Sequence, residues 1–479
     1  MEGSGKTKLI VIGGGPGGYP AAFLAADLGM DVTLVDVTAK PGGVCLHRGC
    51  IPSKALLHVA RVLAEAAEAA EWGAKFPAPQ SDLEQLRQWK NSVVDRLTGN
   101  LAHLREQRKI TFVHGRGRVA DPHTVVVEPG EGQPAQTLTA DFILLATGSI
   151  SAMLPGLPDD PRIMNSDVAL EVRDVPKTLL VVGGGYIGLE LGTVYAALGS
   201  KVTVAERAVG LLPNVDRDLV ELLSRRLRLR FDKILLDTKV TDVAAQPDGI
   251  AVRMVGLPSV QLDQPVQVFE KILIAIGRRP ASSNLGLETT RVQLDPRGFI
   301  RTDRQRRTDE PSIFAVGDVA GEPQLAHKAT YEARIAVEAM AGLPSAFDPA
   351  AIPAVVFTDP EIAWAGLTED EARAAGSTAP PYKIARFPWT ASGRATTLER
   401  NDGLTKLVLD AISHRVLGVG MVGLNAGELI AEGVLAIEMG ARAEDLQMTI
   451  HAHPTLSETM MEAADVYFGQ SPHMPQRKR

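Results

Sequence analysis

Two stretches of the chain, 170 residues apart, share one pattern of glycines, apolar residues and a closing acid. Residues 9–36 read LIVIGGGPGGYPAAFLAADLGMDVTLVD, and residues 179–206 read LLVVGGGYIGLELGTVYAALGSKVTVAE. Each stretch predicts an apolar strand, a glycine-rich turn, an apolar helix and a second strand. The paired landmarks are Gly13 and Gly183, Gly15 and Gly185, Gly18 and Gly188, and Asp36 and Glu206.

Both turns follow the spacing G-x-G-x-x-G, and each glycine has a physical task. The first makes the tight turn, the second lets backbone amides approach a pyrophosphate, and the third lets helix and strand pack closely. The acid lies 18 residues after the third glycine, where it can bind a ribose. One copy alone would be weak evidence, but two complete copies predict two dinucleotide sites. Glu206 would repel a 2′-phosphate and favours NAD, although Arg207 beside it keeps NADP open.

Length and charge narrow the remaining choices. A chain of 479 residues predicts several domains, and a net charge of -7 disfavours nucleic-acid binding. No apolar run approaches the roughly 18 residues of a membrane-spanning helix. The N-terminal residues lack the pattern of a targeting peptide, so the expected location is the cytoplasm.

The chain has only two cysteines, Cys45 and Cys50, and a helical pattern follows them to about Gly73. A helix start and the nearby Arg48 and Lys54 would lower a thiol pKa. Three interpretations stay open: buried cysteines without chemistry, a zinc site that includes His47, and a redox-active disulfide beside a flavin. A structural disulfide is weakly motivated, because so short a loop gains little chain entropy.

Near the other end stands the segment TIHAHPTLSE at residues 449–458. His453 is followed five residues later by Glu458, at a predicted helix start. A carboxylate beside an imidazole fixes its tautomer and raises its basicity, which suits a base that deprotonates a thiol. His451 could take the same task on composition alone, and a metal-binding His-x-His pair is another alternative.

Eight motifs together resemble the dihydrolipoamide dehydrogenases, within the group that includes glutathione reductase and mercuric reductase. The resemblance covers residues 9 to 469. Its motifs are GGGPGG at 13–18, CLHRGCIPSK at 45–54, ATGS at 146–149, GGGYIGLE at 183–190, AIGRRP at 275–280, FAVGD at 314–318, LAHKA at 325–329 and HAHPTLSE at 451–458.

The resemblance implies FAD at the first glycine-rich turn and NAD at the second. It implies that Asp318 binds the ribityl chain of the flavin. The other residues that it implies in cofactor binding are Gly13, Gly15, Gly18, Asp36, Lys54, Thr147, Gly148, Gly183, Gly185, Gly188, Glu206 and Gly277. No metal is implied.

The resemblance also implies catalytic roles. Cys45 would exchange with the substrate, and Cys50 would face the flavin. Lys54 and Glu190 would form an ion pair beside the flavin ring. His453 would be the acid/base, oriented by Glu458, and it would face the disulfide of the other subunit of a homodimer.

The implied enzyme is a dihydrolipoyl dehydrogenase that passes electrons from protein-bound dihydrolipoamide through Cys45, Cys50 and FAD to NAD+. Its partner would be the lipoylated carrier of a 2-oxoacid dehydrogenase or glycine-cleavage system. The alternatives are an NAD(P)H-dependent reductase of another small disulfide, a flavoprotein scaffold and a metal-binding module. His47 and Arg48 depart from the usual sequence between the cysteines and could change thiol pKa or substrate preference.

The expected fold class is α/β, with two Rossmann-like dinucleotide-binding domains and an α+β C-terminal dimerisation domain. The predicted regions are an FAD domain at 1–152, an NAD domain at 153–275, a central region at 276–348 that completes the flavin site, and an interface domain at 349–479. Apolar strands are predicted around 407–409 and 416–418.

Overall fold

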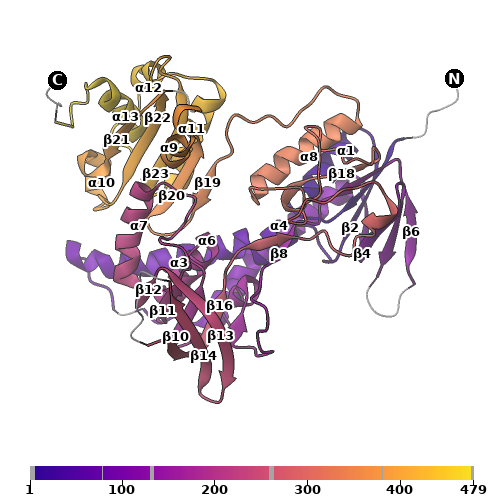
Figure 1. Ribbon diagram of the computed structural model, residues 1–479, viewed down its shortest axis with the longest axis horizontal. Helices are drawn as coiled ribbons and strands as arrows, with labels where there is room; N and C mark the ends of the chain where they lie inside the picture. The colour runs from indigo at the N-terminus through magenta and orange to yellow at the C-terminus, as the bar shows by residue number, and fades with distance from the viewer. Residues whose placement is uncertain (1–5, 78, 130–133, 258–263, 379–380, 476–479) are drawn as a thin grey trace.

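The computed structural model describes residues 6–77, 79–129, 134–257, 264–378 and 381–475. Three lobes, each with a sheet, are arranged around central helices (Figure 1). In that view the N-terminal lobe lies at the right, the second lobe at the bottom and the C-terminal lobe at the upper left. No helix among the described residues is long and apolar enough to cross a bilayer.

The first lobe has a five-stranded parallel sheet in the order β18-β7-β1-β2-β3. Helices α1 and α8 pack together on one face, and a small antiparallel sheet, β4-β5-β6, packs on the other. Strand β1 is apolar and almost wholly buried, as a strand covered on both faces must be. The bounds are β1 Lys8–Ile12, α1 Gly18–Asp27, β2 Asp31–Asp36, β3 Thr111–His114, β4 Arg116–Asp121, β5 Thr124–Glu128, β6 Gln136–Thr139, β7 Phe142–Leu145, β18 Ile313–Ala315 and α8 Ala326–Met340.

The second lobe repeats this plan with the order β12-β11-β10-β16-β9. The repeat extends to strand register: Leu9 pairs with Val32, and Leu179 pairs with Val202. A three-stranded antiparallel sheet, β13-β14-β15, again packs against the main sheet. The bounds are β9 Ile163–Met164, β10 Thr178–Val182, α6 Tyr186–Ala197, β11 Lys201–Ala205, α7 Arg217–Arg230, β12 Lys233–Leu235, β13 Thr238–Gln246, β14 Gly249–Gly256, β15 Val266–Phe269 and β16 Lys271–Ile274.

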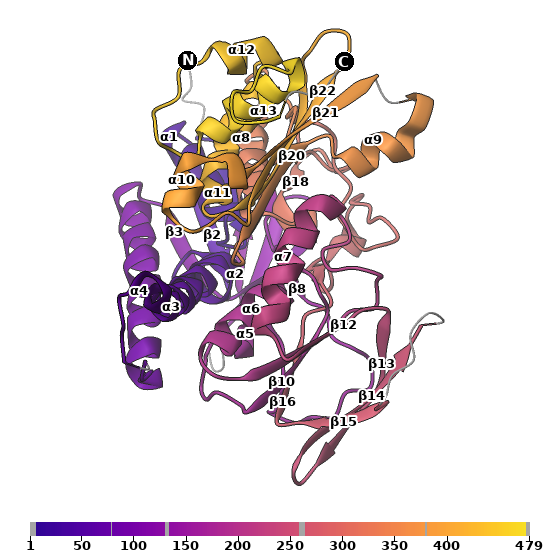
Figure 2. The same cartoon turned by 90° about the vertical axis from the view of Figure 1, so that its left-hand side faces the viewer.

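Helix α3 contacts both α4 and α6, and α4 lies at the outer left edge in Figure 2. Helix α2 contacts α3 and α4. Their bounds are α2 Gly43–Arg48, α3 Cys50–Glu68 and α4 Leu83–Gln107; short connectors are α5 Ser166–Ala169, β8 Ser149–Ser151 and β17 Arg278–Pro280. A short 3₁₀ turn continues α3 to Trp72, and Gly73 ends it with a left-handed φ of 89°. The predicted helix after the cysteines is therefore confirmed.

The C-terminal lobe is an antiparallel sheet in the order β19-β20-β23-β22-β21, with α11 packed on β20 and β23 and α13 on β21 and β22. Strands β22 and β23 confirm the strands predicted around 407–409 and 416–418. The bounds are β19 Ala354–Val356, β20 Glu361–Gly366, α9 Glu369–Ala375, β21 Tyr382–Pro388, α10 Gly393–Thr397, β22 Leu404–Asp410, β23 Val416–Gly423, α11 Ala426–Glu438, α12 Ala443–Met448 and α13 Glu458–Phe468. The predicted fold class is confirmed: two similar α/β lobes precede an α+β lobe.

Candidate active site

The first glycine-rich turn connects β1 to α1. Gly13 has a φ of 105°, and a Cβ on Gly18 would lie 1.7 Å from the Gly13 carbonyl oxygen. A Cβ on Gly15 would meet no atom closer than 3.7 Å, so this turn has room for a ligand. Asp36 accepts a hydrogen bond from the Gly14 amide at the end of β2. The three glycines therefore have the separate tasks that their spacing predicts.

The second turn reproduces the first, residue by residue. Gly183 has a φ of 110°, and a Cβ on Gly188 would lie 2.3 Å from the Gly183 carbonyl oxygen. A Cβ on Gly185 would meet nothing within 4 Å. Glu206 accepts a hydrogen bond of 2.5 Å from the Gly184 amide. Both copies thus offer the same backbone to a dinucleotide phosphate.

Three further predicted cofactor residues follow the neighbouring strands. Gly277 lies three residues after β16, has a φ of 122°, and is at the same sheet edge as the second turn. In the first lobe, Thr147 and Gly148 lie just after β7, and Thr147 donates 2.9 Å to the Ala281 carbonyl. Ligands of open α/β sheets bind outside the carboxyl ends of the strands, so these positions fit the prediction.

One site is a cleft with an empty volume of about 1270 Å³, open solvent included. Residues from the first glycine-rich turn, α2, α3, α6 and the segment after β18 line it. It brings together ten of the predicted residues: Gly13, Gly15, Asp36, Cys45, Cys50, Lys54, Thr147, Gly148, Glu190 and Asp318. The other predicted residues do not line this cleft: Gly18, Gly183, Gly185, Gly188, Glu206, Gly277, His453 and Glu458.

The two cysteines lie on consecutive helices rather than at the start of one. Cys45 is inside α2, Gly49 breaks the helix, and Cys50 is the first residue of α3. The φ and ψ angles of Gly49 are not helical. A Cβ at this position would lie 2.9 Å from the Val44 carbonyl oxygen. Both cysteines are thiols, and Cys45 donates a hydrogen bond to Cys50. The loop therefore places the two thiols close enough for each to change the pKa of the other.

Their hydrogen bond makes the thiols unequal. The hydrogen bond from Cys45 lowers the pKa of Cys50 to about 7, burial opposes this shift, and the charge of Lys54 supports it. The same hydrogen bond, together with burial, raises the pKa of Cys45. At neutral pH, Cys50 is the better thiolate, as the resemblance implies for the sulfur that faces a flavin.

Lys54 and Glu190 form an ion pair across α3 and α6, with Nζ 2.7 Å from Oε2. The other oxygen of Glu190 accepts 3.0 Å from the Phe357 amide, which belongs to the C-terminal lobe. The Lys54 ammonium also lies 4.5 Å from the centre of the Phe357 ring. Because Glu190 is almost fully buried, its charge needs this partner. All three lobes thus meet at the predicted pair.

Asp318 is held by side chains that the sequence analysis did not select. Ser149 donates 2.5 Å to Asp318, and Arg278 donates 2.7 Å to Ser149. Tyr186 lies in the same cleft, and burial raises its pKa to about 12. Ser149 and Arg278 stand inside the motifs ATGS and AIGRRP, so the signal for them was present. Tyr186 stands inside the motif GGGYIGLE, at a position where the glycine spacing specifies no residue type.

The structure separates the two histidines of the C-terminal segment. His451 is bound on both ring nitrogens, by the Thr449 carbonyl at 2.9 Å and by Glu432 at 2.8 Å. The side chain of His453 is 75% exposed, with Nδ1 2.9 Å from Glu458. Hydrogen bonds from Thr455 and His453 lower the pKa of Glu458 against the opposing effect of burial. Both ring nitrogens of His451 therefore have hydrogen-bond partners, whereas His453 is bonded through Nδ1 and its ring is largely exposed.

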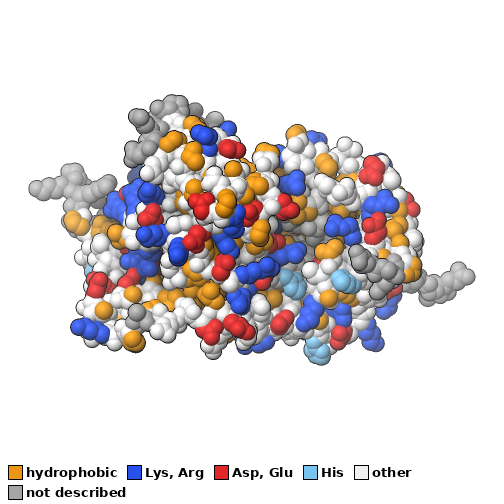
Figure 3. All heavy atoms as spheres, turned by 90° about the horizontal axis from the view of Figure 1, so that it is seen from below, with side chains coloured by type: hydrophobic (Ala, Val, Ile, Leu, Met, Phe, Trp, Pro, Cys, Tyr) orange, Lys and Arg blue, Asp and Glu red, His pale blue; other side chains and the backbone are white. Residues whose placement is uncertain are grey.

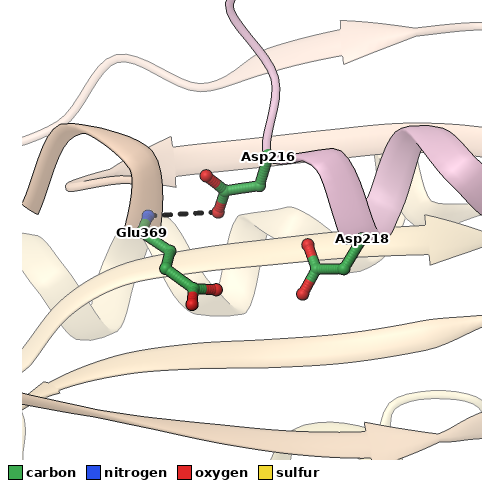
Figure 4. A group of neighbouring side chains, drawn as sticks. All are labelled: Asp216, Asp218 and Glu369. Carbon is green, nitrogen blue, oxygen red and sulfur yellow. Dashed lines mark hydrogen bonds between the residues drawn. The ribbon is translucent and has the colours of Figure 1, made fainter. Parts of the chain in front are cut away.

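A separate acidic group, Asp216, Asp218 and Glu369, lies between α7 and α9 (Figure 4). The buried ammonium of Lys406 lies 2.5, 2.7 and 3.3 Å from these three carboxylates. Asp216 also accepts hydrogen bonds from the first two amides of α9. The group therefore binds a lysine, and it ties the second lobe to the C-terminal lobe.

The residues of the cleft fit a flavin dinucleotide. The first glycine-rich turn leaves open the space that a pyrophosphate needs, and Asp36 ends the strand beside it. Gln324 contributes a buried amide nitrogen, Nε2, with no hydrogen-bond partner, and this residue also lines the cleft. Gln324 directly precedes the LAHKA motif, but no pattern in the sequence marks it.

Comparison with known families gives a match for most of the chain. Residues 7–333 match the pyridine nucleotide-disulphide oxidoreductase family, and residues 352–464 match the dimerisation domain of that family. The chain belongs to this family. Family membership implies FAD and NAD(H) as cofactors, as predicted, and the C-terminal lobe is a dimerisation domain.

Family members similar to this chain were found both by sequence and by structure. The dihydrolipoyl dehydrogenase of Vibrio parahaemolyticus is 46% identical over 99% of this chain and 98% of its own length. That of Thermus scotoductus is 44% identical over 98% and 99%. Among solved structures, LpdA of Mycobacterium tuberculosis has a TM-score of 0.87 at 26% identity over 96% and 99%. The flavoprotein disulfide reductase RclA of Escherichia coli, as a Cu(II) complex, has a TM-score of 0.85 at 26% identity over 96% and 99%.

Proposed function

We propose that this chain is a dihydrolipoyl dehydrogenase, which oxidises protein-bound dihydrolipoamide to lipoamide and reduces NAD+. The observation that carries the proposal is one cleft in which two unequal thiols, an ion pair and a dinucleotide-type turn come together. Relatives named dihydrolipoyl dehydrogenase, with 44% to 46% identity over nearly the whole chain, support the choice of substrate.

The first half-reaction is a thiol–disulfide exchange in which the oxidised enzyme has a Cys45–Cys50 disulfide. A substrate thiolate attacks the sulfur of Cys45, and Cys50 leaves as a thiolate. The second substrate thiolate then attacks the substrate sulfur bound to Cys45, and lipoamide leaves with its own disulfide closed. Two substrate thiols have then become a disulfide, and the enzyme disulfide has become two thiols.

Cys50 suits the leaving role because its lower pKa makes it the better leaving group. Lys54 stabilises the thiolate by charge, and Glu190 with Phe357 holds Lys54 in place. FAD in the cleft would accept the electron pair of the two thiols and deliver it as a hydride to NAD+ at the second turn. Asp318, Ser149 and Asp36 would hold the flavin dinucleotide.

The proton of the substrate thiol is assigned to His453 of the partner subunit. In its own chain, His453 does not line the cleft, and its ring is largely exposed beside Glu458. Large apolar side chains near this segment are also exposed: Leu435 by 62%, Met448 by 79% and Ile450 by 96%. Such exposure favours a homodimer interface here, which would bring the histidine to the other subunit's thiols.

The partner of the dimer is proposed to be a lipoylated carrier protein of a 2-oxoacid dehydrogenase or glycine-cleavage system, in the cytoplasm. On the face drawn in Figure 3, basic side chains are interspersed with acidic ones. This surface gives no support to nucleic-acid binding, in agreement with the net charge of -7.

The domain limits at 152, 275 and 348 also stay proposals.

The decisive experiment mixes the purified protein anaerobically with dihydrolipoamide and then with NAD+, while flavin absorbance is followed. The proposal predicts a long-wavelength band from charge transfer between the Cys50 thiolate and the flavin, and then NADH. A Cys45→Ser variant should retain FAD and lose turnover. If NADPH or NADH produces the band and dihydrolipoamide does not, the enzyme is a reductase of another small disulfide.

A further inference from the structure

The side chain of Gln324 has an unpaired donor in an otherwise well-satisfied molecule. Five buried side-chain nitrogen or oxygen atoms among the described residues have no hydrogen-bond partner. Four belong to charged groups that are paired through another atom, namely Arg105, Arg226, Arg306 and Glu444. The fifth is Gln324 Nε2, and of these five residues only Gln324 lines the cleft.

A buried amide without a partner loses its hydrogen bonds to water and gains none in return. Such a group destabilises the folded state, so native proteins retain few of them. Those that persist need an explanation, and a ligand that completes the hydrogen bond is one. The cleft wall is where such a ligand would lie.

Buried charges hold the backbone that bears Gln324. Lys328 donates 2.8 Å to the Gly321 carbonyl and pairs with Glu332 at 3.2 Å. Glu332 in turn accepts 2.7 Å from the Gly317 amide. Lys328 and Glu332 are both buried. This network holds the segment from residue 317 to residue 325, which supplies both Asp318 and Gln324 to the cleft.

We propose that Gln324 is a cofactor-binding residue, whose Nε2 donates a hydrogen bond to an acceptor atom of the flavin dinucleotide in the cleft. The inference rests on the proposed function, which assigns FAD to this cleft. It predicts opposite effects on the two states of the protein. The amide costs free energy when the cleft lacks its ligand and stabilises the protein when the ligand is bound.

The test uses the full-length flavin holoenzyme and a Gln324→Met variant, which keeps the side-chain length and removes the donor. The dissociation constant for FAD, measured from the rise in flavin fluorescence on dilution, should increase about tenfold, as expected for one lost hydrogen bond. A Gln324→Glu variant has nearly the same shape but only acceptor oxygens when ionised, so its loss should be at least as large.

Unfolding of the same proteins by urea, at a series of free FAD concentrations, provides the second measurement. Bound ligand stabilises by mass action, so Gln324→Met should be less stable than the parent at high FAD. At the lowest FAD concentration the order should reverse, because the unpaired donor is gone. The matched control is Gln305→Met, since Gln305 Nε2 donates 3.2 Å to the Ser345 carbonyl and the residue does not line the cleft. That control should be less stable at every FAD concentration, with unchanged FAD affinity.

An unchanged FAD dissociation constant in both Gln324 variants would overturn the inference, and so would a loss of stability in Gln324→Met that is the same at all FAD concentrations. Failure of the proposed function would look different. In that case the parent protein itself would not form NADH from dihydrolipoamide, whatever the affinity of the variants for FAD.

Discussion

The two glycine-rich turns have the same backbone and very different surroundings. Both show the same strand register, the same left-handed first glycine and the same acid-to-amide hydrogen bond. The first turn opens into a cleft with Cys45 and Cys50, whereas the second contributes only Tyr186 and Ile187 to that cleft and keeps its own glycines outside it. A shared motif thus fixes how a phosphate is bound, and the segments packed around it decide which chemistry follows.

The largest expected effect comes from an added methyl group at the third glycine of each turn. Gly18→Ala would place a Cβ 1.7 Å from a backbone oxygen, and Gly188→Ala would place one at 2.3 Å. Backbone cannot yield to such overlap, so each change should destabilise its lobe by about 4 kcal/mol or more. Flavin content and unfolding temperature are the measurements. Gly18→Ala should lose FAD, whereas Gly188→Ala should keep FAD and lose NAD+ reduction; loss of FAD in both would show that the lobes are not independent.

The next-largest effect concerns the ion pair between Lys54 and Glu190. This pair joins the two repeats, because Lys54 follows the first glycine-rich unit and Glu190 belongs to the second. Lys54→Met removes the cation that supports the low pKa of Cys50, so this pKa should rise from about 7 by about one unit. At pH 7 the thiolate fraction should therefore fall. The pH dependence of charge-transfer absorbance in the reduced holoenzyme measures it. Lys201→Met, at an exposed position in the second lobe, is the control and should leave the curve in place.

Replacing the two acids compares the turns directly. Asp36→Asn should weaken FAD binding and Glu206→Gln should weaken NAD+ binding, each by about tenfold, because a charged hydrogen bond to a ribose is weakened. Flavin release on dilution and the KM for NAD+ are the measurements. The KM for NADP+ should change less in Glu206→Gln, since repulsion of the 2′-phosphate is also removed. An equal change for both nucleotides would contradict the role of Glu206 in selecting NAD.

The smallest effect tests the third lobe. Phe357→Leu keeps the backbone amide that binds Glu190 and removes the ring beside the Lys54 ammonium. A cation–π contact of this kind is modest, so the Cys50 pKa should rise by about 0.5 unit. Phe357→Tyr should restore the curve. Phe112→Leu removes a comparable ring from Arg105, at a centroid distance of 5.0 Å, and should have no effect on Cys50.

Much of the site could be predicted from sequence because its parts are local. Glycine spacing follows from φ and from close approach of backbone, so both turns were found by their pattern. The resemblance implied the pairing of Cys45 with Cys50, and the two lie on consecutive helices separated by Gly49. The resemblance assigned Lys54 to Glu190 and His453 to Glu458, and the structure places both pairs in contact.

The tertiary structure decided what depends on contacts between distant segments. It distinguished His451, bound by Glu432, from the exposed His453, although the two are equivalent by composition. It brought β18, from the predicted central region, into the first sheet and placed Gln324 on the cleft wall. It also placed the ammonium of Lys406 among the carboxylates of Asp216, Asp218 and Glu369.

The sequence by itself determined the two turns and the fold class, since backbone geometry and hydrophobic periodicity are properties of short segments. The tertiary structure alone decided which thiol is the stronger acid, which histidine is free and which buried donor lacks a partner. Each of these depends on burial and on charges that come from remote parts of the chain, and such terms arise only when the lobes pack together.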